Sequence, residues 1–414
     1  MERIITEIVN LANSCDCGNH HNQIPIETIL VGNNVLGEAT AYLQRKSFKK
    51  AVILADENTF RAAGEELTKH LSTTGVGYSS CLLQPDENND VVADEKSLVQ
   101  ALLDTPQDTD VIIAVGSGTI HDIARFTSTK MKIPFISVPT APSVDGFTSM
   151  GAPIIVRGMK KTFQMLAPIA VFADLNVLQN APKKMIAAGF GDMLAKYTSL
   201  ADWKFGHLAY GEPYCPLVAK ITREALEICV EKADKLAATD EEGIRILIEA
   251  LIKSGLAMLL FGQSHPASGG EHHLSHYWEM EFLRQNRPQV LHGAKVGVAV
   301  SLLADVYERD FIQLISESKN LENNIKTTED DSIVKNMKDN LQEIKAAYAA
   351  IPAASQVRQL IEQVGGETLP GQLGIDDDLV VRSLTEAHQL RDRFTALKFL
   401  NEVVKVDHQI KVRN

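Results

Sequence analysis

The 414-residue sequence predicts an amino-terminal α/β domain built on a parallel sheet, followed by an all-helical carboxy-terminal domain. Two observations predict this. In the first half, short apolar runs alternate with amphipathic segments, and several of the runs are continuously apolar, as in parallel strands covered on both faces. After residue 184 strand-like runs become rare, and long segments with helical periodicity replace them.

Six segments of the first half are the expected strands: 27–32, 50–56, 79–83, 110–118, 134–140 and 167–175. Helical stretches such as 64–75 and 119–130 lie between them, which gives the βαβ alternation of an open, doubly wound, Rossmann-like sheet. Pro182 suits the first turn of a helix. We therefore expect a dinucleotide-binding domain over residues 1–182 and a helical, metal-binding and catalytic domain over residues 183–414.

Composition limits the partners. The formal charge of −12 and the lack of a basic block argue against nucleic acid and anionic membranes. No apolar run is long enough to span a membrane, and the first residues lack the pattern of a signal peptide, so no membrane insertion is expected. Five cysteines at irregular spacing indicate a reducing cytoplasm rather than a disulfide framework.

A glycine-rich turn follows the fourth expected strand in "VIIAVGSGTIHD". Gly116 and Gly118 would let backbone amides approach an anion at a helix amino terminus. The pattern departs from G-x-G-x-x-G because residue 121 is histidine, and the turn follows a late strand. A phosphate-binding role and an ordinary tight turn both remain open from these residues alone.

Two further features point to a nucleotide. Asp56 ends an apolar strand, where its carboxylate could accept the ribose hydroxyls of NAD and would repel the 2′-phosphate of NADP; a helix cap is the alternative. The segment 137–153, "SVPTAPSVDGFTSMGAP", carries many polar side chains, and a ligand could supply the partners that they need. These side chains are Thr140, Ser143, Asp145, Thr148 and Ser149.

Three histidines fall within five positions of "SGGEHHLSHYWEMEF". On a helix, His272 and His276 share one face, whereas His273 points about 100° away. His272 and His276 can therefore act on one site, which His273 cannot join.

A carboxylate and a fourth histidine complete a candidate metal site. In "AAGFGDMLAKYTS" two glycines precede Asp192, which we expect in the first turn of a helix, as a cap or as a metal ligand. His292 in "LHGAKVGVAV" begins another helix, with a glycine behind it that allows close approach. Asp192, His272 and His292 would form a three-ligand site with one open position, as in catalytic metal centres, and His276 would be free for proton transfer. Structural, hydrogen-bonded histidines are the alternative.

A rival cluster, "CDCGNHH", contains Cys15, Cys17, His20 and His21. The cysteines are spaced C-x-C, and no second cysteine pair follows nearby. The pattern favours adventitious metal binding, or none, over a structural zinc.

The blocks "VGSGTIHD", "VPTAPSVDGFTS", "GFGDMLAKYTS", "ASGGEHHLSH" and "LHGAKVGVAV" together resemble the glycerol-1-phosphate dehydrogenases, in particular their bacterial branch. This family belongs to the superfamily of iron-type alcohol dehydrogenases, glycerol dehydrogenases and dehydroquinate synthases. The resemblance covers the chain from about residue 25 to residue 400. It implies a dehydroquinate synthase-like fold with the metal in a cleft between the two domains.

The resemblance also implies roles for individual residues. Asp192, His272 and His292 hold one divalent metal, nickel or zinc. Asp145, Asp192 and His276 contact the substrate, and Asp192 and His276 are the catalytic pair. NAD, with NADP as an alternative, is bound by Asp56, Gly116, Ser117, Gly118, Thr119, Ile120, Thr140, Ser143 and Ser149. Ser117 replaces a glycine of many superfamily members, which an ordinary φ would tolerate. A homodimer is expected on the same basis.

The expected reaction is reversible reduction of dihydroxyacetone phosphate, a small phosphorylated triose, to sn-glycerol 1-phosphate for glycerophospholipid synthesis. Cations must bind the phosphate, and the sequence does not rank the candidates Lys160, Lys161, Lys196, Lys204 and Arg284. The alternatives are a glycerol or polyol dehydrogenase, dehydroquinate synthase chemistry, and a catalytically silent nucleotide-binding regulator.

Overall fold

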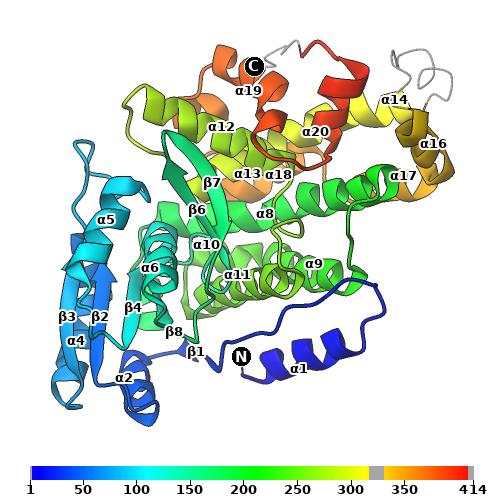
Figure 1. Ribbon diagram of the computed structural model, residues 1–414. Helices are drawn as coiled ribbons and strands as arrows, with labels where there is room; N and C mark the ends of the chain where they lie inside the picture. Colours follow the sequence, from blue (N-terminus) through cyan, green and yellow to red (C-terminus); the bar gives the residue numbers. More distant parts are fainter. Residues whose placement is uncertain (1, 317–330, 409–414) are drawn as a thin grey trace.

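The computed structural model describes residues 2–316 and 331–408 and contains a six-stranded parallel sheet with the order β1-β8-β5-β4-β2-β3 (Figure 1). The six strands predicted from sequence are all present, and the predicted fold class is confirmed. Their bounds are β1 Thr28–Gly32, β2 Lys50–Ala55, β3 Gly77–Leu82, β4 Val111–Gly116, β5 Phe135–Pro139 and β8 Ala170–Asp174.

Helices cover both faces of the sheet, which is why its central strands are apolar throughout. In β2, Ile53 packs with α2 (Leu36–Arg45) and α4 (Glu65–Ser72), whereas Leu54 packs with α5 (Glu95–Asp104) and α6 (Gly118–Met131). Successive side chains of a strand point to opposite faces, so a strand buried on both sides has no polar alternation.

A hairpin that the sequence prediction missed follows β5. Strands β6 (Gly151–Val156) and β7 (Met159–Gln164) pair antiparallel as a separate two-stranded sheet. Arg157 and Gly158 form its turn, with φ of 54° and 71°, as two-residue hairpin turns require. Strand β7 is polar and mostly exposed, so it carries no apolar alternation from which to predict a strand.

The other regular elements of the described chain are helices. The longer helices are α8 (Lys183–Phe205), α9 (Pro216–Glu231), α11 (Glu241–Phe261), α12 (Gly270–Arg284) and α13 (His292–Val306). The remaining α-helices of the described residues are α1 Glu2–Asn13, α3 Glu57–Thr59, α7 Leu175–Leu178, α10 Ala233–Ala238, α14 Gln313–Ser316, α16 Asp331–Asp339, α17 Leu341–Ala349, α18 Ala354–Gln363, α19 Asp377–Glu386 and α20 Ala396–Phe399. Short 3-10 and π segments join several of them. Within the described residues, no helix is both long enough and apolar enough to cross a bilayer.

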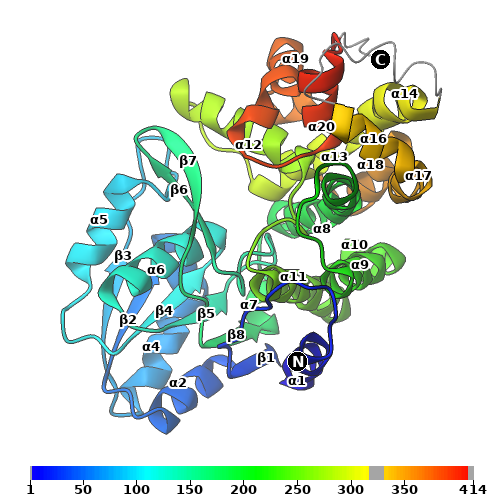
Figure 2. The ribbon, with the colours of Figure 1, turned by 45° about the vertical axis from the view of Figure 1, so that its right-hand side comes forward.

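The amino-terminal segment lies against the helical part of the molecule. Ile8 of α1 belongs to the same core as α9 and α11, and Figure 2 shows α1 beside these helices, away from β2 and β3. The backbone amide of Asn22 donates to the carbonyl of Leu260. Helix α8 begins directly after Pro182. The domain division at residue 182 stays a prediction, and these contacts associate the first residues with the helical side.

Helices α8 and α13 pack backbone to backbone. A Cβ at Gly191 would overlap the carbonyl oxygen of Gly293, and one at Gly293 would overlap that of Ala188. Glycine alone permits so close a contact between helices. The sequence pattern predicts Asp192 in the first turn of a helix, and this prediction is wrong. Helix α8 begins at Lys183, so the glycines before Asp192 lie inside the helix and do not mark its start.

Candidate active site

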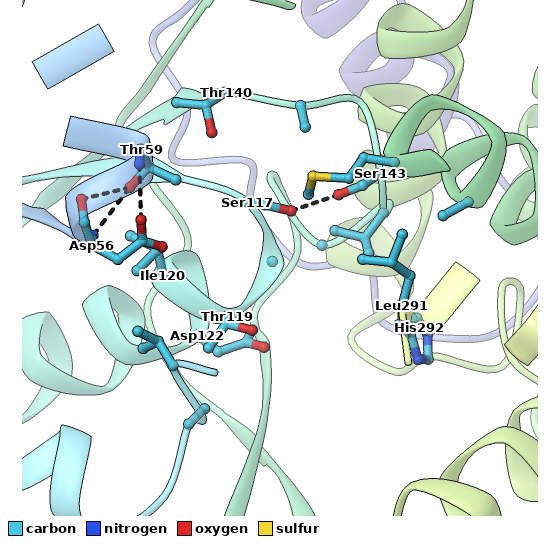
Figure 3. Close-up of a pocket in the computed structure, with 18 of the residues that line it drawn as sticks. Asp56, Thr59, Ser117, Thr119, Ile120, Asp122, Thr140, Ser143, Leu291 and His292 are labelled. Atoms are coloured by element: carbon cyan, nitrogen blue, oxygen red, sulfur yellow. Dashed lines mark hydrogen bonds between the residues drawn. The ribbon is translucent and has the colours of Figure 1, made fainter. Parts of the chain in front are cut away.

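A cleft of ≈ 1300 Å³ runs from the carboxyl ends of the sheet strands to helices α8, α12 and α13. Asp56 lies at one end of the view in Figure 3 and His292 at the other, with Ser117 and Ser143 between them. Parallel strands all end at one edge of a sheet, and ligands of such folds bind outside that edge. Residues from both halves of the chain therefore line one continuous space.

The turn after β4 forms the middle of the cleft. Ser117 is the residue that directly precedes α6, and its φ of −98° is ordinary, so this position does not require glycine. Its hydroxyl oxygen lies 2.5 Å from that of Ser143. Gly116 does need to be glycine, because a Cβ there would overlap the side chain of Ile120. The first residues of α6, Gly118, Thr119 and Ile120, line the cleft, and a helix amino terminus in such a position can receive an anion.

Asp56 lines the cleft and also caps a helix, so the alternative of a helix cap is observed, while its role in nucleotide binding stays a prediction. Its Oδ1 accepts a hydrogen bond of 2.8 Å from the Thr59 amide, and the Thr59 hydroxyl accepts one from the Asp56 amide. Among the described residues, Oδ2 has no hydrogen-bond partner. The cap fixes the carboxylate and leaves one oxygen for a ligand.

The loop after β5 carries the polar side chains singled out from sequence, and they divide between two roles. Thr140, Ser143 and Ser149 line the cleft. Thr148 instead donates to the Ile252 carbonyl at 3.0 Å and is fully buried, so it holds the loop against α11.

Asp192, His272 and His292 converge at the other end of the cleft, and we call them the cleft cluster. One donor atom from each lies within 4.8 Å of the others. The α8–α13 contact brings Asp192 beside His292, and α12 supplies His272, whose Nε2 is 3.6 Å from Asp192 Oδ1. His273 lies outside the cluster, buried, and neither of its ring nitrogens has a partner among the described residues.

Glu271 orients His272. Its Oε1 accepts from His272 Nδ1 at 2.7 Å and from the Gly269 amide, and its Oε2 accepts from the Thr198 hydroxyl. This carboxylate fixes the ring so that Nε2 faces Asp192, an arrangement common around metal-binding histidines. Burial lowers the pKa of His272, but Asp192 and Glu271 outweigh burial and raise it overall.

A buried cation holds two carboxylates together behind the cluster. Lys196 lies 2.8 Å from Asp145 Oδ2 and 3.4 Å from Asp192 Oδ1, and Ser254 donates to Asp145 at 2.8 Å. Burial raises the pKa of Asp192, but Lys196 and His272 bring it below its ordinary value. Burial and the charge of Asp192 raise the pKa of Asp145. The carboxylate of Asp192 therefore stays ionised, as a ligand must.

His276 stands beside the cluster, with its ring centroid 5.7 Å from that of His292. Arg391 Nη2 lies 3.1 Å from its Nδ1. A guanidinium only donates, so Nδ1 accepts, and the neutral ring carries its proton on Nε2. Burial, followed by the charge of Arg391, lowers the pKa of His276 well below its usual value and keeps the ring neutral.

Three cations line the wall near His276. Lys160, from the hairpin, and Lys295, from α13, bind the two oxygens of Glu279 at 2.7 and 3.2 Å, and Arg391 lies nearby in the same cleft. Among the five cations that the sequence offered, Lys160 alone lines the cleft. Lys161 is exposed, Lys196 is occupied by Asp145, Lys204 pairs with Glu343, and Arg284 is 73% exposed beside Glu281.

Sequence reasoning missed Lys295, Glu279 and Arg391. Lys295 and Glu279 each lie three residues from a histidine of the site, on the same helices, and this spacing could have indicated them. Arg391 carries no such signal, because it follows α19 and reaches the cleft only through the tertiary fold.

Comparison with known proteins places these features in a family. Residues 30–182 match the family model described as iron-containing alcohol dehydrogenase. The chain is 55% identical over 408 residues to the glycerol-1-phosphate dehydrogenase, NAD(P)+, of Geobacillus stearothermophilus, with 98% of this chain and 100% of that protein covered. A protein of the same name from Geobacillus thermodenitrificans is 54% identical over the same shares of both chains. Among solved structures, maleylacetate reductase from Agrobacterium tumefaciens has a TM-score of 0.64 at 14% identity, covering 93% of this chain and 97% of that chain, a likeness of fold.

Proposed function

The chain belongs to the glycerol-1-phosphate dehydrogenase family, and on that premise we propose that it reversibly reduces dihydroxyacetone phosphate to sn-glycerol 1-phosphate with NAD(P)H, for glycerophospholipid synthesis. The observation that carries this proposal is the convergence of Asp192, His272 and His292 at the end of a cleft that begins at Asp56. The residues that would hold a nucleotide and those that would hold a divalent metal therefore line one space.

The cleft cluster fits a divalent metal. Its donors are one carboxylate and two imidazoles, and Nδ1 of His292 is buried without a hydrogen-bond partner among the described residues. Burying a polar atom without a hydrogen-bond partner costs free energy of folding. Coordination of a metal ion by His292 would give this buried imidazole a partner. Three protein ligands leave a coordination position for substrate. Nickel and zinc both suit this donor set.

NAD is the proposed nucleotide, with NADP as the alternative. Asp56 would accept the ribose hydroxyls, and the amides after Gly116, with Thr119 and Ile120, would receive the pyrophosphate. Thr140, Ser143 and Ser149 border the same space. The free oxygen of Asp56 would repel a 2′-phosphate, which favours NAD.

When bound, the nicotinamide supplies the hydride and the metal polarises the substrate carbonyl. The remaining tasks fall to the chain. His276 holds a proton on Nε2 because Arg391 occupies its Nδ1, so it can donate toward the oxygen that gains charge at C2. Asp192 and Asp145 border the substrate, and Lys196 keeps them in place.

We assign the substrate phosphate to Lys160, Lys295 and Arg391. These three cations lie on one wall of the cleft near His276, and the two lysines share a single carboxylate partner, Glu279, in their ion pairs among the described residues. Charged hydrogen bonds to phosphate are strong, and a surplus of cations in a buried cleft selects an anionic substrate.

The deciding experiment is NADH oxidation by metal-stripped protein with zinc or nickel restored. Dihydroxyacetone phosphate is compared with dihydroxyacetone, and the product is offered to an enzyme specific for sn-glycerol 3-phosphate. Activity that needs both metal and phosphate, with a product that this enzyme refuses, is expected. Faster turnover of dihydroxyacetone would instead indicate a polyol dehydrogenase, and NADH binding without any turnover would indicate a silent regulator.

Lys160→Ala tests the phosphate assignment. We expect KM for dihydroxyacetone phosphate to rise about 10- to 100-fold, since a hydrogen bond to a charged group contributes about 1.5–3 kcal/mol. Lys161→Ala is the matched control, because it removes the same charge from the exposed face of the same strand. Equal effects of the two substitutions would contradict the assignment.

A homodimer and a cytoplasmic location remain predictions that rest on the resemblance and on cysteine usage. Light scattering on the purified chain tests the first, and cell fractionation the second.

A further inference from the structure

A second group of metal-ligating side chains lies outside the cleft, and we call it the thiol cluster. It consists of Cys15, Cys17, His21 and Cys215, with one donor atom from each within 4.8 Å of the others. The first three come from the segment after α1. Cys215, which immediately precedes α9, lies 200 residues after Cys15 along the chain. None of the four lines the cleft.

Three donor–donor distances lie close to those of a tetrahedral zinc site, and all four donor atoms lie within 4.8 Å of one another. Cys15 Sγ lies 3.8 Å from Cys215 Sγ, Cys17 Sγ lies 3.6 Å from His21 Nε2, and His21 Nε2 lies 3.3 Å from Cys215 Sγ. Around a zinc ion with ordinary bond lengths, sulfur atoms are about 3.8 Å apart, and sulfur and nitrogen about 3.6 Å. The Cys15–Cys215 separation is also far longer than a disulfide bond, and all five cysteines are free.

The surroundings also suit thiolate ligands. Cys215 caps the 16-residue helix α9, where its sulfur accepts from the Val218 amide at 3.5 Å, and a helix amino terminus stabilises a thiolate. Asn19 spans the site, since its Nδ2 donates to the Tyr214 carbonyl at 2.8 Å and lies 3.5 Å from Cys17 Sγ. Partners of this kind orient metal ligands.

We propose that the thiol cluster binds one structural zinc ion, with three thiolates and one imidazole as ligands, which fastens the segment after α1 to the start of α9. Four protein ligands leave no position for substrate, so the site is structural and separate from the cleft. The sequence pattern favoured adventitious binding or none because it offered only a C-x-C pair. The fold supplies the missing thiol.

Cobalt substitution tests the site in the full-length protein. Tetrahedral cobalt bound to thiolates gives an intense near-ultraviolet sulfur-to-cobalt charge-transfer band, whereas the oxygen and nitrogen donors of the cleft cluster give none. We expect the band in protein loaded with cobalt, and we expect it to persist in His292→Ala, which removes a cleft ligand. Absence of the band from the cobalt-loaded natural sequence would overturn the proposal.

Substitution within the cluster gives an independent readout. Cys17→Ser should abolish the band, remove one zinc per chain by elemental analysis and lower Tm by several degrees, while the rate of NADH oxidation is kept. His21→Ala should act similarly, and His20→Ala is the matched control, because His20 is exposed and lies outside the cluster. Unchanged zinc content in both Cys17→Ser and His21→Ala would overturn the proposal.

Thiol counting on the natural sequence does not depend on the folding of any variant. The unfolded, unreduced chain should show five reactive thiols once zinc is chelated, and fewer before chelation. Three thiols under both conditions would mean a Cys15–Cys215 disulfide in place of the metal site.

Discussion

The cleft cluster and the thiol cluster differ in donor atoms, in ligand number and in access. Asp192, His272 and His292 offer oxygen and nitrogen at the end of a ≈ 1300 Å³ cleft. The thiol cluster offers three sulfurs and one nitrogen between a chain segment and a helix end. An open coordination position suits the first to catalysis, and a closed set of four suits the second to holding the chain together.

The elements that carry the ligands differ in the same way. Each cleft ligand projects from a long helix, and the backbone contact between α8 and α13 fixes two of these helices. The thiol cluster takes three ligands from the segment between α1 and β1, which forms no helix or strand of its own. In the cleft the fold therefore positions the ligands, whereas at the thiol cluster the metal would position the fold.

The largest expected effect comes from His292→Ala. Loss of a cleft ligand removes Lewis-acid stabilisation of several kcal/mol, so kcat/KM should fall by about 10³-fold or more. Tm and the cobalt–thiolate band should be unchanged. Steady-state kinetics and calorimetry on the same preparation check this, and a drop in Tm as large as that of Cys17→Ser would erase the contrast between the clusters.

The second largest expected difference between the clusters is the number of protons released when zinc binds. Burial raises the pKa of the Cys215 thiol to about 12 in the metal-free chain, so this thiol must give up its proton on binding. At the cleft, Asp192 is already ionised, and His272, with its raised pKa, is the proton competitor. Because acid protonates the ligands, zinc affinity should decrease at both clusters as the pH is lowered, by about 10-fold per pH unit for each proton that zinc displaces. The decrease should therefore be steeper at the thiol cluster, which has three thiol ligands, than at the cleft.

Titration calorimetry in buffers of different ionisation enthalpy measures these protons. His292→Ala isolates the thiol cluster, and the Cys15→Ser, Cys17→Ser double variant isolates the cleft. Equal proton release by the two variants would contradict the assigned ligand sets.

Glu271→Gln is expected to have an intermediate effect. The amide keeps the shape but loses the charge and one acceptor that orient His272, and loss of such a partner lowers metal affinity about 10- to 100-fold. Chelator competition measures the change. Glu279→Gln is the control, since Glu279 lies in the same cleft but binds Lys160 and Lys295 instead of a metal ligand. If Glu279→Gln lowers the metal affinity as much as Glu271→Gln does, the effect would come from loss of a negative charge in the cleft and not from the orientation of His272.

The two clusters also show what a sequence can predict. Continuous apolar runs revealed the inner strands β2, β4, β5 and β8, because burial on both faces leaves that pattern in the chain itself. The proposed cleft ligands could be predicted because His272 and His276 share a helix face and each ligand lies in a recognisable block. Cys215 could not be paired with Cys17, since nothing in their spacing connects residues 198 positions apart.

Two local errors have physical causes. The hairpin that carries Lys160 was missed because its second strand is exposed and polar. Asp192 was expected at a helix start because glycine often ends regular structure. Here glycine instead allows α8 to meet α13, a tertiary requirement that no local pattern expresses. The roles assigned to the site residues stay predictions until the experiments above are done.

The smallest expected effect is that of Asn19→Ala, which tests whether the thiol cluster depends on a supporting partner as the cleft cluster depends on Glu271. Asn19 holds the Tyr214 carbonyl and approaches Cys17, so its loss removes about 1 kcal/mol of hydrogen bonding and should lower Tm by about 1–2 °C. Gln23→Ala is the control, an exposed amide on the same segment. With zinc removed, the Tm difference between Asn19→Ala and the natural sequence should shrink, because Asn19 then supports only its own hydrogen bond. A difference that is the same with and without zinc would mean that Asn19 acts on the loop alone and that the thiol cluster tolerates loss of its supporting partner.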